Sequence, residues 1–401
     1  MRKTTVKGMN EYLPEETELR DYLQQTILAT YKSCGFQRIT TPIMEDIENL
    51  KKSEGGENLE LLFEVMKRGD KLKKSIENKE YNRLTDMGLR YDLTLPLTRY
   101  YSNNRDKLMN PFRCIQMDRV YRAERPQKGR LREFVQCDID IIGQQSNVAE
   151  IELITTTAKA LQAIGINAFA VRINDRRLLQ MVLLQIGFKE EELESVCITL
   201  DKLDKIGSSG VEQELKDKGI SVEIQERFLS LLNKMPLTIT DVAQICKDSG
   251  VIDNIETIMK SVQVVSQGKY NINYDFTLVR GQGYYTGTIF EITSSEFRGA
   301  IAGGGRYDNL IGKFTGGNSI PAVGFSIGFE RIYGILKEKG YKIPTRNKVA
   351  VVYEENAVVD AIQKAELLRA DADVFLVVRK KNYYKQLELL RSQGIGEVVE
   401  L

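Results

Sequence analysis

The stretch Phe112 to Gly143 reads FRCIQMDRVYRAERPQKGRLREFVQCDIDIIG, and the fold class follows from its pattern. Its first part alternates apolar and polar residues, as Ile115 and Met117 do around Gln116, which is the period of a β-strand. A second strand-like run covers residues 134–142. We therefore predict a long β-hairpin.

The turn of this hairpin is strongly basic. Five cations surround Pro126 and Gly129: Arg122, Arg125, Lys128, Arg130 and Arg132. Guanidinium groups match phosphate oxygens two at a time, so the turn suits a polyanion. On the second strand, Gln136 and Asp140 share one face because alternate strand residues point the same way. A solvated, charged hairpin is the competing interpretation, since charge clusters are often surface features.

Composition places the chain among ordinary globular proteins. Its 401 residues allow two or three domains, and 57 Lys and Arg against 56 Asp and Glu give a net charge of +1. Any contact with nucleic acid must then depend on local basic patches. The five cysteines suggest neither a disulfide framework nor a zinc site. No apolar run has the length of a membrane span and no signal-peptide core is present, so we predict a cytoplasmic protein without a membrane partner.

The chain contains no histidine. Ser-His-Asp and Cys-His catalysis, a histidine general base and histidine-ligated metals are therefore excluded. Carboxylates, Arg, Lys, Tyr, backbone donors and bound cations remain. Phosphoryl-type chemistry, which depends on positioning and charge stabilisation, fits these groups. We predict no resident metal site.

The first hundred residues predict helix and strand in turn. Apolar spacing predicts a helix over 16–33, followed by a strand that is interrupted at Pro42. The segment LFEVMKRGDKL (62–72) resembles a hairpin. Alternation over 89–95 predicts a strand with Asp92 and Thr94 on its polar face, and a helix that Pro96 begins.

Helical periodicity dominates the middle of the chain. A helix is predicted over 146–164, a short strand over 169–173 and a mostly helical insertion over about 175–265. A strand then continues through Phe276 and Leu278 to the sequence RGQG (280–283). Its glycines permit a sharp turn or a close approach to a ligand, and Arg280, Tyr284 and Tyr285 stand at this bend.

Two further glycine-rich segments follow. Three consecutive glycines in GGGRYD (303–308) allow a ligand to approach the backbone, with Arg306, Tyr307 and Asp308 as polar groups beside it. Residues 319–340 predict a strand that leads into a helix, with Arg331 in its first turns. The tail from 348 alternates strand and helix, which predicts a small three-stranded sheet.

These motifs together resemble the histidyl-tRNA synthetases. RVYRAERPQKGRLREFVQ (119–136) is similar to motif 2 of class II aminoacyl-tRNA synthetases, LVRG…YY (278–285) and GGGRYD resemble the two histidine-specific signatures, and SIGFER (326–331) resembles motif 3. The helix and proline-containing strand near the N-terminus resemble motif 1, which builds the dimer interface in that family. The resemblance implies an α+β class II synthetase fold: an antiparallel sheet core flanked by helices.

The resemblance also implies a division of the chain. Residues 1–170 would form the first part of the catalytic core with motifs 1 and 2, and 171–265 the helical insertion domain. Residues 266–344 would complete the core with the histidine signatures and motif 3. Residues 348–401 would form a shortened α/β domain like the anticodon-binding domain of the family.

The activity that the resemblance implies is that of a histidine–tRNA ligase. Histidine's carboxylate attacks the ATP α-phosphate, and the histidyl group then passes to the terminal adenosine of histidine tRNA. The expected substrates and partners are L-histidine, ATP with Mg²⁺, histidine tRNA and a second copy of the chain in a homodimer.

The family's roles transfer to particular residues. Arg280 and Arg122 would be catalytic, with Arg122, Glu124, Arg130 and Arg331 binding ATP. Histidine would be bound by Asp92, Thr94, Gln136, Asp140, Tyr284, Tyr285 and Tyr307. Gln127 and Arg132 would meet the acceptor end of the tRNA.

Asp92 and Asp140 stand where many bacterial members of the family have glutamate, as in its eukaryote-like branch. An alternative family member stays open at this point. The regulatory subunit of ATP phosphoribosyltransferase shares the core and binds histidine without catalysis. It generally loses the motif 2 arginines and the arginine of LVRG, whereas Arg122 and Arg280 are retained here.

Overall fold

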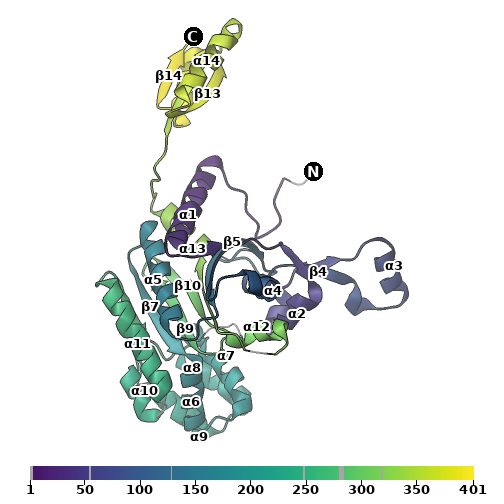
Figure 1. Cartoon of the computed structure of the whole chain (residues 1–401), viewed down its shortest axis with the longest axis vertical. Helices are drawn as coiled ribbons and strands as arrows, with labels where there is room; N and C mark the ends of the chain where they lie inside the picture. Colours follow the sequence, from purple (N-terminus) through teal and green to yellow (C-terminus); the bar gives the residue numbers. More distant parts are fainter. Residues whose placement is uncertain (1–2, 54–55, 128, 247–248, 280–283, 318) are drawn as a thin grey trace. The chain divides into compact units, whose positions relative to one another are not determined.

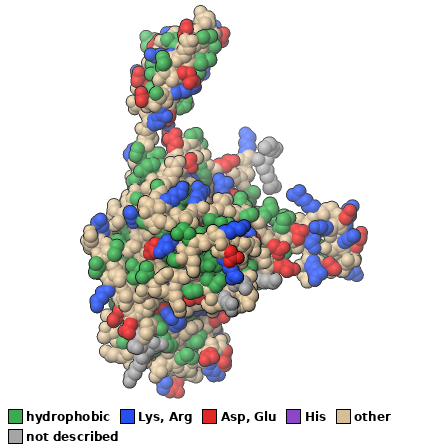
Figure 2. Space-filling model, viewed as in Figure 1, with side chains coloured by type: hydrophobic (Ala, Val, Ile, Leu, Met, Phe, Trp, Pro, Cys, Tyr) green, Lys and Arg blue, Asp and Glu red, His purple; other side chains and the backbone are tan. Residues whose placement is uncertain are grey.

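The computed structural model describes residues 3–53, 56–127, 129–246, 249–279, 284–317 and 319–401. The chain forms two compact units, Met1–Lys339 and Gly340–Leu401. In the view of Figure 2, basic and acidic side chains are interspersed on the visible face rather than gathered into one patch. This mixture agrees with the net charge of +1.

An eight-stranded sheet forms the centre of the first unit (Figure 1). Its strand order is β1-β5-β6-β11-β10-β9-β7-β8. All neighbours in it are antiparallel except the two outermost pairs, β1 with β5 and β7 with β8. The antiparallel sheet predicted from the motifs is therefore confirmed. Its strands are β1 Gln37–Arg38, β5 Phe112–Tyr121, β6 Glu133–Ile142, β7 Phe169–Asp175, β8 Asn271–Tyr274, β9 Thr288–Ser294, β10 Phe297–Arg306 and β11 Ala322–Gly328.

The predicted hairpin is formed by β5 and β6, which pair without interruption from Phe112 opposite Ile142 to Tyr121 opposite Glu133. Its turn is closed by a backbone bridge in which Gln127 and Arg130 exchange N–H to O bonds of 3.0 and 2.9 Å. Long pairing of this kind fixes the register, so every second side chain of β6 points to the same face of the sheet.

Helices cover both faces of this sheet. On one face, α1 Pro14–Ser33 and α5 Val148–Ala163 pack against each other, and α11 Ser249–Ser266 packs beside α5. On the other, α4 Thr94–Asn104 and α12 Asp308–Thr315 share an apolar cluster with strand residues that include Phe112 and Ala322. This second face also carries the candidate site. Helix α13 Phe329–Glu338 follows β11 directly, as predicted.

A second, smaller sheet has the order β2-β4-β3. It consists of β2 Met44–Asp46, β3 Glu64–Met66 and β4 Thr85–Leu89, with α2 Ile47–Ser53 beside it. The hairpin predicted for 62–72 is wrong. β3 pairs with β4, and the chain after it turns into helix α3 Gly69–Glu77, because its run of Lys, Leu and Glu consists of good helix formers.

Two predicted strands are shorter than expected. β4 ends at Leu89, so Asp92 and Thr94 do not share a strand face; Asp92 Oδ1 accepts the Leu95 N–H at 3.1 Å and helps to begin α4. β8 ends at Tyr274 because Asp275 Oδ1 accepts the Thr277 N–H at 2.9 Å, which closes a local turn. Side-chain acceptors compete with the sheet at both places.

Helices fill the segment between β7 and β8. They are α6 Arg176–Ile186, α7 Leu193–Leu200, α8 Leu203–Asp217, α9 Val222–Leu232, α10 Ile239–Ile245 and α11. The helical character of this insertion is as predicted, while its status as a separate domain stays a prediction. Across the described ranges, no helix is both long enough and apolar enough to span a membrane.

The second unit contains a parallel three-stranded sheet of order β13-β12-β14. Its elements are β12 Asn347–Tyr353, α14 Val358–Leu368, β13 Ala372–Val378, α15 Tyr383–Ser392 and β14 Glu397–Glu400. Ala350 and Val352 face α15, whereas Val351 packs with Ala361 and Ala365 of α14. The alternation of strand and helix predicted for the tail is confirmed.

Candidate active site

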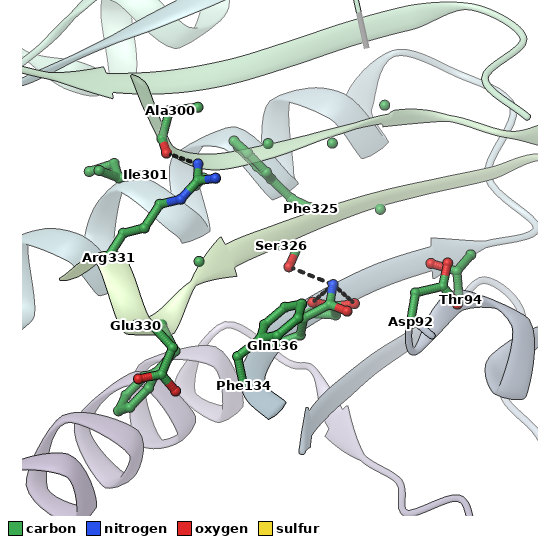
Figure 3. A pocket seen from close by; sticks show the side chains of 18 of the residues that line it. Asp92, Thr94, Phe134, Gln136, Ala300, Ile301, Phe325, Ser326, Glu330 and Arg331 are labelled. Carbon is green, nitrogen blue, oxygen red and sulfur yellow. Dashed lines mark hydrogen bonds between the residues drawn. The ribbon is translucent and has the colours of Figure 1, made fainter. Parts of the chain in front are cut away.

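A cavity of about 240 Å³ opens on the face of the central sheet that β6, β10 and β11 form (Figure 3). The beginning of α4, the basic turn after β5 and the beginning of α13 complete its walls. The two ends of the cavity differ in charge. One end is lined by buried carboxylates and the other by arginines.

Three aspartates form the acidic end. Asp138 and Asp140 project from β6 on the face that Gln136 shares, and Asp92 stands just before α4. Their residue exposures are only 6% for Asp92, 5% for Asp138 and 3% for Asp140. Within the described residues, none of the three forms an ion pair with a lysine or arginine. Buried carboxylates without a cationic partner are costly, and so they mark a place where a cationic or hydrogen-bond-donating ligand is expected.

The pKa values of these acids reflect their burial. The pKa of Asp140 is raised to about 7, because burial and, to a smaller extent, the charge of Asp92 outweigh the lowering by the Tyr307 hydrogen bond. The pKa of Asp138 is raised well above its ordinary range by burial and by Asp140. Burial also raises the pKa of Asp92, although the backbone N–H of Leu95 and the nearby Arg122 act in the opposite direction. Perturbed carboxyl groups gathered in one cavity are typical of functional sites.

Glycines keep the floor of the cavity open. A Cβ on Gly324 would lie 2.1 Å from Asp140 Oδ1, and a Cβ on Gly304 would lie 2.0 Å from the carbonyl oxygen of Gly324. Gly324 of β11 therefore leaves room for the Asp140 side chain, and Gly304 of β10 allows the two strands to lie close together. The approach of a ligand to the GGGRYD glycines stays a prediction.

Tyrosines form the wall beside Asp140. The Tyr307 hydroxyl donates a hydrogen bond of 2.6 Å to Asp140 Oδ1. Tyr284 stacks edge-on against Tyr307, with ring centroids 6.0 Å apart, and lies 4.9 Å from the ring of Tyr285. Asp140 thus lies in a narrow aromatic compartment, which suits a flat ligand ring with an N–H donor.

Arg122 lines the cavity as one of its cations, near enough to Asp92 to act against the rise in the pKa of that carboxyl. Its guanidinium carbon is 4.2 Å from the ring centroid of Tyr91 and 5.1 Å from that of Phe134, and its Nε donates to the Tyr91 carbonyl oxygen at 3.3 Å. Stacking between rings fixes the plane of the guanidinium and leaves its other N–H groups directed along that plane. Such a group is ready to bind a phosphate.

Arg331 and Arg130 extend the cationic end. Arg331, in the first turn of α13, donates to the carbonyl oxygen of Ala300 on β10 (Figure 3). Arg130 lies 3.5 Å from Glu124, and both line the cavity. The site therefore offers several cations at the end away from the aspartates.

Glu330 secures the beginning of α13. Its carboxylate accepts two hydrogen bonds from Arg20 of α1, at 2.6 and 2.8 Å, and a third from the Val135 N–H of β6 at 3.3 Å. The Arg20 guanidinium lies 4.0 Å from the ring centroid of Tyr12. Sequence reasoning missed this group, and it fixes the helix that carries Arg331.

The structure brings most of the predicted site residues together. The cavity is lined by Asp92, Thr94, Arg122, Glu124, Arg130, Gln136, Asp140, Tyr284, Tyr285, Tyr307 and Arg331. Gln127 and Arg132 do not line it; the Arg132 Nε donates to the Glu124 carbonyl oxygen at 3.0 Å. Arg280 and Lys128 lie outside the described residues.

One expectation for the GGGRYD segment is wrong. Arg306 and Asp308 do not line the cavity. Arg306 makes a buried bidentate ion pair with Glu150 of α5, at 2.7 and 2.8 Å, and Asp308 Oδ1 accepts the Ala322 N–H at 2.9 Å. The strand alternation explains this outcome, because Arg306 ends β10 on the opposite face from the glycine-lined floor.

Asp138 and Ser326 are site residues that the sequence reasoning missed. Asp138 could have been found from the alternation that identified Gln136 and Asp140, since it lies between them on the same face. Ser326 pairs directly with Asp138 across β6 and β11, and only knowledge of this register identifies it. Among the described residues, no group of Cys, Asp or Glu side chains is arranged to hold a metal ion.

Comparisons with known proteins agree with this geometry. Residues 8–332 match the family model described as histidyl-tRNA synthetase. A histidine–tRNA ligase of Leifsonia xyli is 38% identical to the chain over 98% of its length and 93% of the relative's. A histidine–tRNA ligase of Cytophaga hutchinsonii is 35% identical over 91% of this chain and 84% of the relative's.

Solved structures show the same fold. A histidyl-tRNA synthetase from Nostoc superposes with a TM-score of 0.80 at 29% identity, covering 98% of this chain and 90% of that one. A Bacillus halodurans protein titled as an ATP phosphoribosyltransferase regulatory subunit/histidyl-tRNA synthetase also has a TM-score of 0.80. It is only 20% identical over 100% of this chain and 98% of that one, so it supports the fold alone.

Proposed function

The chain belongs to the histidyl-tRNA synthetase family, and we propose that its two-ended cavity activates L-histidine with ATP and transfers it to histidine tRNA. The observation that carries this proposal is the separation of charge within one cavity. Unpaired buried carboxylates suit the cationic amino acid, and arginines suit the triphosphate. An amino acid and ATP bound end to end would meet in the middle of the cavity.

The reaction has two steps. An oxygen of the histidine carboxylate attacks the α-phosphorus of ATP, and the bond from that phosphorus to the bridging oxygen breaks, which releases pyrophosphate. A terminal hydroxyl of the tRNA then attacks the carbonyl carbon of the adenylate, and AMP leaves. Negative charge builds at the phosphate in the first step, so fixed cations beside it lower the barrier.

The acidic end would hold histidine by its donors. Asp92 and Gln136, with Thr94 beside them, would accept hydrogen bonds from the ammonium group. Asp140 would accept an imidazole N–H within the compartment of Tyr284, Tyr285 and Tyr307. A buried carboxylate rejects a ligand without that donor because it would stay unpaired.

The cationic end would hold ATP. Arg122 and Arg331 would neutralise phosphate oxygens, with Glu124 and Arg130 contributing at the rim. Arg280 would stabilise the charge that develops at the α-phosphate, and this role rests on the resemblance of LVRG…YY alone. Mg²⁺ would accompany ATP, with most of its ligands coming from phosphate oxygens and water rather than from this chain.

Transfer requires the tRNA acceptor end to reach the same cavity. Gln127 at the turn of the β5–β6 hairpin, and Arg132 at its base, would guide that end by contact with phosphate and sugar groups. The regulatory role in ATP phosphoribosyl transfer is the less favoured alternative, since Arg122 and Arg130 of motif 2 line the cavity and the relatives of highest identity described above are named as ligases.

A homodimer in the cytoplasm completes the proposal. The small sheet β2-β4-β3 exposes three methionines, with relative exposures of 51% for Met44, 54% for Met66 and 39% for Met87. Apolar side chains gathered on one small sheet suit an interface between two copies. Light scattering of the purified protein would give the mass of two chains, and a monomer at micromolar concentration would contradict this part.

The test of the function is charging itself. The protein would be incubated with ATP, Mg²⁺, labelled histidine and histidine tRNA, and label bound to the tRNA through an alkali-labile ester would be measured. We expect ester formation that depends on ATP and on histidine tRNA. Binding of histidine without any charging would favour the regulatory alternative.

A further inference from the structure

Only the nitrogen of the Gln136 side-chain amide has hydrogen-bond partners among the described residues. Its Nε2 lies 3.2 Å from Oγ of Ser326 and 3.4 Å from Oδ2 of Asp138 (Figure 3). Its Oε1 is buried and has no hydrogen-bond partner within the part of the chain that the structure describes. A buried carbonyl oxygen without a partner is unfavourable, so a ligand donor is expected there.

The strand register explains why these three side chains meet. Asp138 of β6 lies directly opposite Ser326 of β11, and Gln136 lies opposite Gly328. Directly opposite residues of antiparallel strands share a face and lie close together. Because Gly328 has no side chain, the Gln136 amide has room to lean towards Ser326.

The chemistry of the neighbours fixes which way the amide faces. Gln136 Nε2 lies 3.5 and 3.4 Å from Oδ1 and Oδ2 of Asp138, and a carboxyl group keeps at least one accepting oxygen in either protonation state. Ser326 Oγ also accepts from Gln136 Nε2, at 3.2 Å. Both contacts are therefore made by the amide N–H₂, and the reversed amide would place Oε1 against the accepting oxygens of Asp138.

We propose that Asp138, acting through Ser326 and Gln136, is a positioning residue that selects the protonated α-amino group of the amino acid substrate. It does so by turning Gln136 Oε1 towards the ligand as an acceptor. This inference rests on the proposed function, in which Gln136 meets the ammonium of histidine. Asp138 also lines the cavity, so a double-mutant comparison is needed to separate its action through Gln136 from direct contact with the ligand.

The direct test is Asp138→Asn, which keeps the shape but offers both a donor and an acceptor to Gln136. The amide then has no preferred orientation. We expect calorimetry to show a histidine Kd roughly 10-fold higher, the size of one hydrogen bond to a charged group. The KM for ATP in pyrophosphate exchange would stay the same, and Asp106→Asn, whose side chain is 95% exposed, is the matched control.

The readout specific to positioning is discrimination between histidine and its α-hydroxy analogue, in which a hydroxyl replaces the ammonium. The ratio of their Kd values should fall several-fold in Asp138→Asn. An unchanged ratio, or equal losses for histidine and ATP, would overturn the proposal because a purely structural role predicts them. Should Asp138→Asn fail to fold, Ser326→Ala interrupts the same chain and should lower the same ratio.

A double-mutant comparison separates positioning from direct contact. In a Gln136→Ala background, Asp138→Asn should change the histidine Kd by less than about 2-fold, because its effect passes through Gln136. A full additional 10-fold loss would overturn the proposal. Histidine-dependent exchange by the unmodified chain tests the proposed function separately, so the two failures are distinguishable.

Discussion

The two ends of the cavity are built on opposite electrostatic principles. At the acidic end, Asp92, Asp138 and Asp140 are buried with no ion-pair partner among the residues described. At the cationic end, Arg122 and Arg331 are already held, by stacking on aromatic rings and by a backbone carbonyl oxygen. The acidic end therefore lacks a positive partner for its carboxylates, and the cationic end presents fixed positive charge to a ligand.

This difference indicates what each end does. Unpaired buried acids gain most when a cation arrives, so that end is suited to binding and selection. Arginines whose planes are fixed beforehand need no reorganisation as charge develops, so their end is suited to catalysis. Changes at the two ends should therefore affect different kinetic constants.

The largest expected effect comes from the cationic end. Arg331→Ala should lower kcat/KM for ATP in pyrophosphate exchange by roughly 10²- to 10³-fold, as loss of one charge-stabilising donor does. Calorimetric histidine binding should stay within a factor of about two. Lys337→Ala, on the same helix with a side chain 53% exposed, is the control. Equal losses for both substrates would remove the distinction between the ends.

A change at the acidic end should have the opposite profile. Asp92→Asn keeps Oδ1 as the acceptor of the Leu95 N–H but removes the charge. We expect a histidine KM roughly 30- to 100-fold higher, because a charge-assisted contact is lost, with the KM for ATP unchanged. A rise in the KM for ATP alone would contradict the placement of Asp92 at the acidic end.

The pH dependence of stability provides a third comparison. Burial raises the pKa of Asp140 from 3.8 to about 7, so the folded chain binds this proton more tightly than the unfolded one. Ionisation of Asp140 therefore destabilises the ligand-free folded chain progressively as the pH rises from 3.8 to about 7. Asp92 and Asp138 are near enough to share the effect, and the Tyr307 hydroxyl and Cys114 also face Asp140.

Asp140→Asn removes this titration. We expect the free energy of unfolding of the variant, relative to that of the unmodified chain, to increase by about 2 kcal/mol from pH 5.5 to pH 8. Urea unfolding without ligand at both pH values would measure this difference. The Tyr307 hydrogen bond persists because Asn keeps the Oδ1 acceptor. A stability difference between the two chains that is the same at pH 5.5 and pH 8 would mean that Asp140 is already ionised at pH 5.5.

The smallest expected effect tests the space beside Asp140. Gly324→Ala places a Cβ 2.1 Å from Asp140 Oδ1 and 3.2 Å from the Tyr307 ring, so the carboxyl must move. We expect the histidine KM to rise roughly 10-fold, about 1.4 kcal/mol, with the KM for ATP unchanged. Gly334→Ala in α13, where a Cβ meets nothing within 4 Å, should leave both constants unchanged.

Much of this arrangement could be predicted because it depends on period and residue type. Alternation identified β5 and β6, and with them the shared face of Gln136 and Asp140. Three other features depend on local interactions that compete with strand formation, and the periodicity of the sequence does not reveal them. Side-chain acceptors at Asp92 and Asp275 end β4 and β8 early, and the Lys-rich run after β3 becomes α3 rather than a second strand.

The acidic end was only partly predictable for a similar reason. Asp138 lies on the predicted face, but its importance depends on Ser326, which is 188 residues away in the chain and opposite it in the sheet. The ion pair of Arg20 with Glu330 likewise joins α1 to α13. Contacts between distant segments follow from the register and packing of the folded chain, which local patterns do not encode.

The most direct test of the two-ended account is exchange of labelled pyrophosphate into ATP in the absence of tRNA. The account predicts exchange that requires histidine, is lost in Arg331→Ala while that variant still binds histidine, and is recovered in Asp92→Asn at high histidine concentration. Histidine binding by the unmodified chain without exchange would contradict it, because the cationic end would then not perform activation.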